Sequence, residues 1–164
     1  MESKYASALI GGLAGGLIAA LLNLPQNFIS WFGCLAYVGC GLIAVWHYTN
    51  THQLTITGGE GVGLGALSGV AGGLTGGLLG SLFYQLGLMH PVLPQILEEM
   101  ENTGTLDQMD PSTADSVISW LELASKWQVL IDVTCSVLFA VVFGLIGGAI
   151  GARIWKKGPE EPDI

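Results

Sequence analysis

The side chains best suited to chemistry lie in a polar stretch between two apolar segments, where His47, His52 and Glu60 are close in sequence. Imidazole and carboxylate groups bind zinc or transfer protons. The two histidines are five residues apart, however, whereas zinc proteases place theirs four apart on one helix face. The sequence contains no HExxH, CxxC or EF-hand pattern. We therefore expect polar residues at a membrane interface, with no bound metal and no cofactor.

A glycine-rich stretch at residues 57–65, TGGEGVGLG, could be mistaken for a phosphate-binding loop. Such loops follow a strand and lead into a Gly-Lys-Ser/Thr motif, and the sequence indicates neither. Thr57 with Glu60 three residues later has instead the pattern of a capping box, in which each side chain bonds to the other residue's backbone. The pattern predicts a helix that begins just after Thr57.

Asp132 is the one acidic residue that falls inside an apolar segment. Charged groups in a bilayer are costly and mark ion or proton pathways when they occur. Asp132 lies only a few residues into its segment, where water can reach it, so we favour a structural role over a proton- or cation-linked one. Cys34, Cys40 and Cys135 all fall in apolar sequence, where free cysteine behaves as a small apolar residue. No catalytic set can be assembled, and we do not expect an enzyme.

The elements that position these residues are membrane spans. Of 164 residues, 51% are hydrophobic and 11% are charged, and the mean hydropathy is +0.58. These values indicate an all-α integral membrane protein whose main partner is the lipid bilayer. The net charge of −8, from 13 acids and 5 bases, argues against binding to nucleic acid.

Apolar runs predict one membrane domain over residues 1–164, a four-helix bundle with spans at about 5–24, 29–48, 61–88 and 129–155. The first run is too long for the core of a cleaved signal peptide, which is the competing interpretation. Residues 90–128 form an acidic insert between the third and fourth spans, and residues 156–164 form a polar tail.

Within the insert, a helix is predicted to begin at Pro111. Asp110 is suited to the N-cap, and Pro111 is suited to the first helical position. Apolar residues recur on one face, at Val117, Trp120, Leu121, Ala124 and Trp127. This face could lie on the bilayer surface or cap the bundle. We favour capping, because helices that lie on membranes are usually basic.

Glycines recur at every fourth position of the third span, from Gly61 to Gly77, and a second row runs from Gly72 to Gly80. Small residues at this spacing let helix backbones approach closely, as in a glycine zipper. The residues expected to pack helices together are Gly12, Gly16, Gly61, Gly65, Gly69, Gly73, Gly77, Gly147 and Gly151. One neighbour need not use both rows, so the surplus row leaves room for a homo-oligomer or a partner in a membrane complex.

Residues 7–22 and 68–83 can be aligned with eight identities, which suggests that spans one and three are repeats. A duplication would give a 2+2 parallel repeat about an axis along the membrane normal, and convergent glycine-rich composition is the alternative. We expect spans one and three to cross at their glycine faces, with spans two and four outside.

The positions of the lysine and arginine residues predict how the chain is oriented in the membrane. Lys4, Arg153, Lys156 and Lys157 belong to one side of a four-span protein, and Lys126 alone belongs to the other. The positive-inside rule therefore predicts a multi-pass protein of the cell inner membrane with both termini cytoplasmic.

Residues 54–80, LTITGGEGVGLGALSGVAGGLTGGLLG, follow GGLAGG at 11–16 and LNLPQNFISWFGC at 22–34. With these stretches the chain resembles a group of small prokaryotic four-span membrane proteins of unknown function. The resemblance implies the fold over nearly the whole chain, although this sequence has an extra glycine before Glu60 and fewer cysteines in the first turn. It implies no activity and no site residue. We expect a non-enzymatic structural or accessory unit, and the alternative is a small channel or transporter for ions or a small solute.

Overall fold

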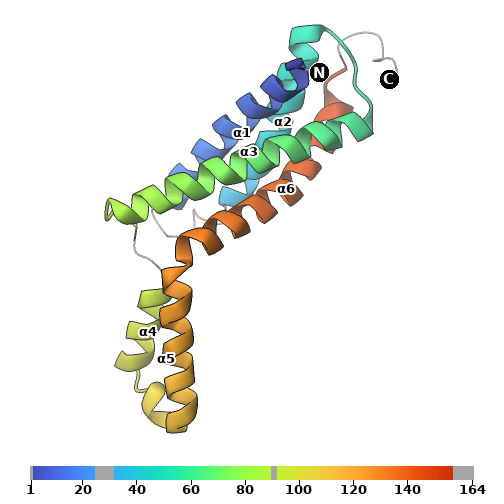
Figure 1. The fold of residues 1–164 in the computed structure, drawn as a ribbon. Coiled ribbons are helices and arrows are strands. Elements are labelled where there is room, and N and C mark those ends of the chain that lie inside the picture. The colour runs from blue at the N-terminus through green and yellow to red at the C-terminus, as the bar shows by residue number, and fades with distance from the viewer. Residues whose placement is uncertain (1, 25–31, 90–91, 157–164) are drawn as a thin grey trace.

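The computed structural model describes residues 2–24, 32–89 and 92–156, and these ranges contain helices and no strand (Figure 1). The long helices are α1 (Glu2–Asn23), α2 (Gly33–His52), α3 (Gly58–Gln85) and α6 (Gln128–Ile154). The insert contains α4 (Val92–Asn102), the short 3₁₀ helix η2 (Leu106–Gln108) and α5 (Pro111–Lys126). The polar tail from residue 157 onward lies outside the described residues.

Two helices begin where local sequence signals predict. The Glu60 amide donates to Thr57 Oγ1 at 3.3 Å, and the Thr57 amide donates to Glu60 Oε2 at 3.0 Å, which confirms the capping box. At the start of α5 the Ser112 amide donates to the Asp110 carboxylate at 3.2 Å, with Pro111 in the first turn. Both caps satisfy amide groups that a helix N-terminus otherwise leaves unpaired.

Three helices among the described residues are long and apolar enough to cross a membrane: Lys4–Asn23 of α1, α3 and α6. The helix α2 begins later than the expected second span and ends in polar sequence at His47 and His52. It does not meet the same criterion, and residues 29–31 of that expected span lie outside the described part of the chain.

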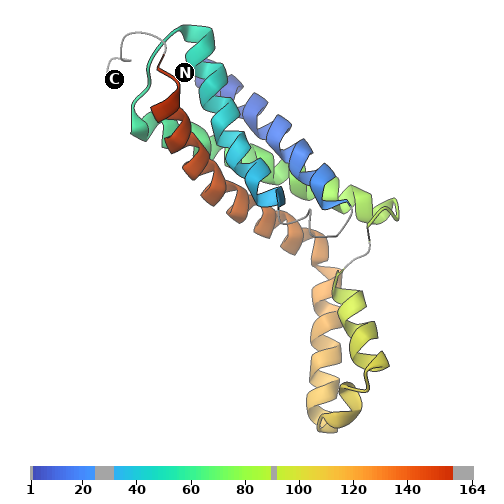
Figure 2. The ribbon, with the colours of Figure 1, turned by 180° about the vertical axis from the view of Figure 1, so that it is seen from behind.

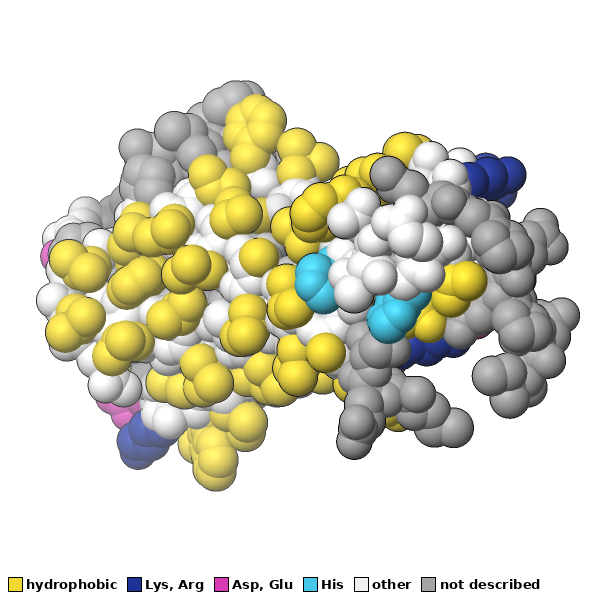
Figure 3. All heavy atoms as spheres, turned by 90° about the horizontal axis from the view of Figure 1, so that it is seen from above, with side chains coloured by type: hydrophobic (Ala, Val, Ile, Leu, Met, Phe, Trp, Pro, Cys, Tyr) yellow, Lys and Arg dark blue, Asp and Glu magenta, His cyan; other side chains and the backbone are white. Residues whose placement is uncertain are grey.

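Large apolar side chains cover the outside of these helices, whereas small residues fill the inside. Leu13, Leu17, Leu78 and Leu138 are about half exposed, while Ala19 and Ala140 have no exposed surface. Hydrophobic side chains spread over the flank seen in Figure 3, and the histidines and neighbouring polar groups occupy one end of it. A bundle in water has the reverse distribution, so the surface suggests a membrane protein.

The helices α1, α2, α3 and α6 form one bundle, seen from both sides in Figures 1 and 2. The helices α2 and α3 each contact α1 and α6, and they also contact one another, while the α3–α6 contact is the most extensive. The expectation that spans two and four lie outside a central pair of spans one and three is therefore wrong. The central pair is α2 and α3.

The two glycine rows of α3 face different neighbours. A Cβ atom at Gly61 would lie 2.5 Å from the Gly148 carbonyl oxygen of α6, and one at Gly77 would lie 2.9 Å from Val133 Cα of α6. In the second row, a Cβ atom at Gly72 would lie 2.7 Å from Cys40 Sγ of α2. Gly72 and Gly76 of the second row thus face α2 inside the bundle and give no argument for an outside partner, while Gly80 has no described atom within 4 Å of such a Cβ atom.

Adjacent glycines of α1 and α6 likewise point to different helices. A Cβ atom at Gly16 would lie 2.5 Å from the Gly72 carbonyl oxygen of α3, whereas Gly15 faces Cys40 of α2. On α6, Gly147 faces the Val38 carbonyl of α2, and Gly148 faces Gly61 of α3. Each flanking helix therefore meets α2 and α3 simultaneously with neighbouring residues.

The contacts do not follow a two-fold parallel repeat. Such an axis would relate α1 to α3 and α2 to α6, so the α2–α3 contact would have an α6–α1 counterpart. The helices α2 and α3 pack together, but no comparable α1–α6 contact exists within the described ranges. The similarity between residues 7–22 and 68–83 is therefore not matched by symmetric packing.

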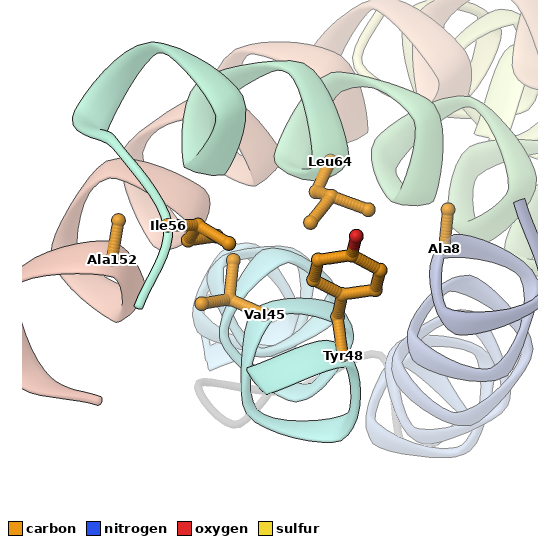
Figure 4. Packing of buried hydrophobic residues seen from close by; sticks show 6 residues of the cluster. All are labelled: Ala8, Val45, Tyr48, Ile56, Leu64 and Ala152. Carbon is orange, nitrogen blue, oxygen red and sulfur yellow. The ribbon is translucent and has the colours of Figure 1, made fainter. Parts of the chain in front are cut away.

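At the end of the bundle where α1 begins and α6 ends, a small apolar core joins all four helices and the loop after α2 (Figure 4). Its buried members are Ala8, Val45, Tyr48, Ile56, Leu64 and Ala152. The side chains point toward one another between the helix ends, which closes this end of the bundle.

The insert does not cap the bundle. The helix α5 packs against α4 and η2 and only briefly against α6, and the pair α4 and α5 projects from the far end of the bundle (Figure 1). The expected apolar face remains largely uncovered, with Trp120 72% exposed and Trp127 57% exposed, although Ala124 is buried. The expectation of capping is wrong, because α4 and α5 pack against each other and project away from the bundle.

Candidate functional site

The most distinctive site is a cavity of about 410 Å³ at the insert end of the bundle, which we call the end cavity. All four long helices line it, so it lies between them. Its polar side chains are Asn23, Tyr37, Ser81, Tyr84, Asp132 and Ser136. The rest of its wall is largely apolar and includes the glycines Gly76, Gly77 and Gly80.

The carboxylate of Asp132 is the one charged group of the described wall. Gln128, four residues earlier on α6, hydrogen-bonds to this carboxyl group. The second oxygen, Oδ2, is buried and has no hydrogen-bond partner among the described residues. Buried polar atoms are nearly always paired, so an unpartnered carboxylate oxygen on a residue of the cavity wall calls for a partner such as a water, an ion or a ligand.

A hydrogen bond between two helices forms the floor of the end cavity. Tyr37 Oη of α2 and Ser136 Oγ of α6 are 2.7 Å apart. Beneath them Cys40 and Ala140 have no exposed surface, and they belong to a cluster of buried side chains with Ala19 and Ala36. The cavity is thus closed toward the other end of the bundle and forms a dead end, not a pore.

Two other polar side chains of the wall hydrogen-bond within their own helices. The Ser81 hydroxyl donates to the Gly77 carbonyl at 2.8 Å, and the Asn23 amide donates to the Ala19 carbonyl at 2.9 Å. Two thiols also line the cavity: Cys34 is partly buried, and Cys135 is exposed. Asp132 Oδ2 is the buried side-chain atom without a hydrogen-bond partner in the described part of the chain.

The polar residues at the opposite end are placed in separate interactions. Glu60 Oε1 accepts from Lys4 Nζ at 2.9 Å, and His47 Nδ1 lies 2.9 Å from Ser7 Oγ. The ring of His52 packs against Tyr48 at a centroid distance of 4.9 Å. Each of the three residues nominated by sequence contacts a different partner, and the described ranges hold no cluster of His, Cys, Asp or Glu suited to a metal ion.

Sequence analysis singled out Asp132 but missed the residues that surround it. Tyr37, Tyr84 and Ser136 come from three different helices, and each resembles ordinary span sequence. No local pattern connects them. The one signal in the sequence was an aspartate inside an apolar segment, and we expected that carboxylate to be hydrated near the membrane surface. The structure instead buries one of its oxygens.

Comparisons with protein-family models, curated proteins and solved structures give no match, so the argument for function rests on the chain itself.

Proposed function

We propose that this chain is a four-span protein of the cell inner membrane that acts without catalysis, as a structural or accessory unit assembled by glycine-zipper packing. The observation that carries the proposal is the approach of α3 to α6, where Cβ atoms at Gly61 and Gly77 would lie within 3 Å of α6 atoms. Backbones this close are typical of helices packed in lipid, where small residues replace hydrophobic burial as the source of stability.

The proposed orientation places both termini in the cytoplasm. Supporting it, α1 begins and α6 ends at the same end of the bundle as the loop after α2, and this end carries Lys4 and Arg153 (Figure 1). Alkaline phosphatase fused after residue 156 is expected to be inactive in cells, and the same enzyme inserted near residue 104 is expected to be active. The reverse pattern would refute the orientation.

Assembly is tested by substituting leucine for glycine at two kinds of position. Gly73→Leu combined with Gly77→Leu places bulky side chains against α6, whereas Gly63→Leu adds one where no described atom lies within 4 Å. We expect the double variant to lose the native particle in detergent and Gly63→Leu to keep it. Equal behaviour of the two would remove glycine packing from the proposal.

A homo-oligomer or membrane-complex partner is expected to meet exposed apolar side chains such as the outward leucines, since the first glycine row of α3 faces α6 and Gly72 and Gly76 face α2. Native mass spectrometry in mild detergent measures the number of copies. A purely monomeric particle would remove the homo-oligomer from the proposal. The accessory role would then require a different protein as the partner.

The end cavity favours a second candidate, a small transporter for an ion or small solute. An unpaired carboxylate oxygen on a residue that lines the cavity between the long helices is suited to a coupling ion or a substrate. The closed floor favours a transporter that changes conformation over an open channel. Flux into liposomes should exceed that of empty vesicles and fall with Asp132→Asn. No flux of protons, common cations and small neutral solutes would eliminate this candidate.

A further inference from the structure

We propose that the end cavity binds a small organic cation with a single positive charge, whose ammonium group bonds to Asp132. The proposal shares the cavity with the transporter candidate but does not require transport. It begins from Asp132 Oδ2, which is buried and has no partner among the described residues. A carboxyl group in such a place is costly to ionise unless a positive group joins it.

The charge of the wall selects a cation. Asp132 is its only charged side chain, and no lysine, arginine or histidine lines the cavity in the described part of the chain. An anion would find no counter-charge among the described residues of the wall, whereas a monovalent cation would neutralise Asp132. The polar hydroxyls of Tyr37 and Ser136 already bond to each other, which leaves the carboxylate as the main acceptor.

The chemistry of the wall argues against a metal ion. Calcium takes six to eight oxygen ligands, and structural zinc takes four nitrogen or sulfur ligands. The described residues contain no group of three His, Cys, Asp or Glu side chains that could hold a metal ion. A single carboxylate in a wall that also includes Tyr84 and Phe139 is better suited to an ammonium group, which can use Asp132 for its charge and the aromatic side chains for its remaining surface.

The size and polarity of the wall select an organic molecule. About 410 Å³ lies within the range of pockets that bind small molecules, and it is far larger than a bare monovalent ion. Most of the wall away from Asp132 is apolar, with Met89, Phe139 and glycine backbones. A ligand that carries an apolar group next to its ammonium would fill this part, whereas an inorganic ion would not.

The two thiols of the wall allow a direct test on the full chain in phosphatidylcholine nanodiscs. In a Cys135→Ser background, Cys34 reports on the cavity, while Cys40 is fully buried. The probes are benzylamine, butylamine and tetramethylammonium, with benzyl alcohol as the neutral counterpart of the first. We expect at least one of the cations to slow labelling of Cys34 by a water-soluble maleimide in a saturable manner, and benzyl alcohol to have no such effect.

Asp132→Asn should weaken protection by at least about tenfold, in line with the strength of hydrogen bonds to charged groups. Asp115→Asn removes one equal charge from the exposed side of α5 and should leave protection unchanged. Asp132→Glu, which keeps the charge, should retain part of the protection of Cys34. Protection by benzyl alcohol equal to that by benzylamine would overturn the proposal, and so would absence of protection by all three cations.

The comparison of benzylamine with benzyl alcohol in the Cys135→Ser background needs no change at Asp132, so it decides the matter even if Asp132→Asn fails to fold. The test also separates binding from transport. Protection without flux in liposomes refutes the transporter and leaves the binding site, whereas flux without protection by any cation refutes the binding site and leaves the transporter.

Discussion

A single methyl group on α3 should distinguish close helix packing from simple apolar composition. Gly73 and Gly80 are both interior residues of the same helix, seven positions apart. A Cβ atom at Gly73 would lie 2.8 Å from the Ser136 carbonyl oxygen and 2.8 Å from the Val137 nitrogen, both backbone atoms of α6. At Gly80 no described atom lies within 4 Å of the same position.

The magnitude follows from the distances. Ordinary contacts of Cβ atoms begin at 3.4 Å, so Gly73→Ala requires α3 and α6 to separate by at least about 0.6 Å, the difference between 3.4 and 2.8 Å. Overpacking of this kind costs about 1–3 kcal/mol, because backbone atoms cannot rotate aside as a side chain does. The methyl group added by Gly80→Ala contacts no described atom. The free energy of unfolding of this variant should therefore lie within about 1 kcal/mol of that of the wild type, given the helix preference of alanine.

The assay is reversible unfolding in mixed micelles with increasing dodecyl sulfate, followed by the fluorescence of the native tryptophans and by circular dichroism. We expect the midpoint for Gly73→Ala to fall well below that of the wild type and of Gly80→Ala. If Gly73→Ala is as stable as Gly80→Ala, the close approach of α3 and α6 does not hold the fold together, and the argument from glycine spacing fails.

Three further outcomes are expected. Trp120 and Trp127 should be quenched by brominated phosphatidylcholine, because their exposed face continues into the apolar start of α6; unquenched emission in nanodiscs would place the hairpin in water. Tyr37→Phe should lower the free energy of unfolding by about 0.5–1.5 kcal/mol through loss of its bond to α6, as measured by the same titration. Thr57→Ala should lower it by about 0.5–2 kcal/mol, and Thr57→Ser should restore it.

Local signals in the sequence located the helix starts well, because a cap depends on residues within one turn. Thr57 with Glu60, and Asp110 with Pro111, need no information from the rest of the fold. The all-helical class also followed from long apolar runs, since three of them form helices apolar enough to cross a membrane.

The partner of each glycine could not be predicted in the same way. Gly72 and Gly73 are adjacent and chemically identical, yet one faces Cys40 of α2 and the other faces Val137 of α6. Glycines four residues apart indicate a helix face without large side chains, but they do not indicate which helix packs against that face. The arrangement of α2 and α3 at the centre therefore required the structure.

The amphipathic pattern of the insert had the same limitation. It correctly indicated one apolar face on α5, but an apolar face can meet lipid, protein or another part of its own hairpin. Ala124 is buried, while Trp120 and Trp127 remain exposed. The pattern separates polar from apolar sides, and only the direction of the chain after α4 decides what the apolar side meets.

The end cavity follows from the same glycines that hold the bundle together. From Gly61 to Gly77 each glycine of the first row meets α6, so the absence of side chains brings backbones into contact. At Gly80 the neighbouring helices are no longer within reach, and the absence of a side chain then leaves space. Small residues thus have opposite effects at the two ends of α3. Where the helices converge, small residues allow close packing that stabilises the bundle. Where the helices diverge, small residues leave a cavity beside Asp132 that larger side chains would have filled.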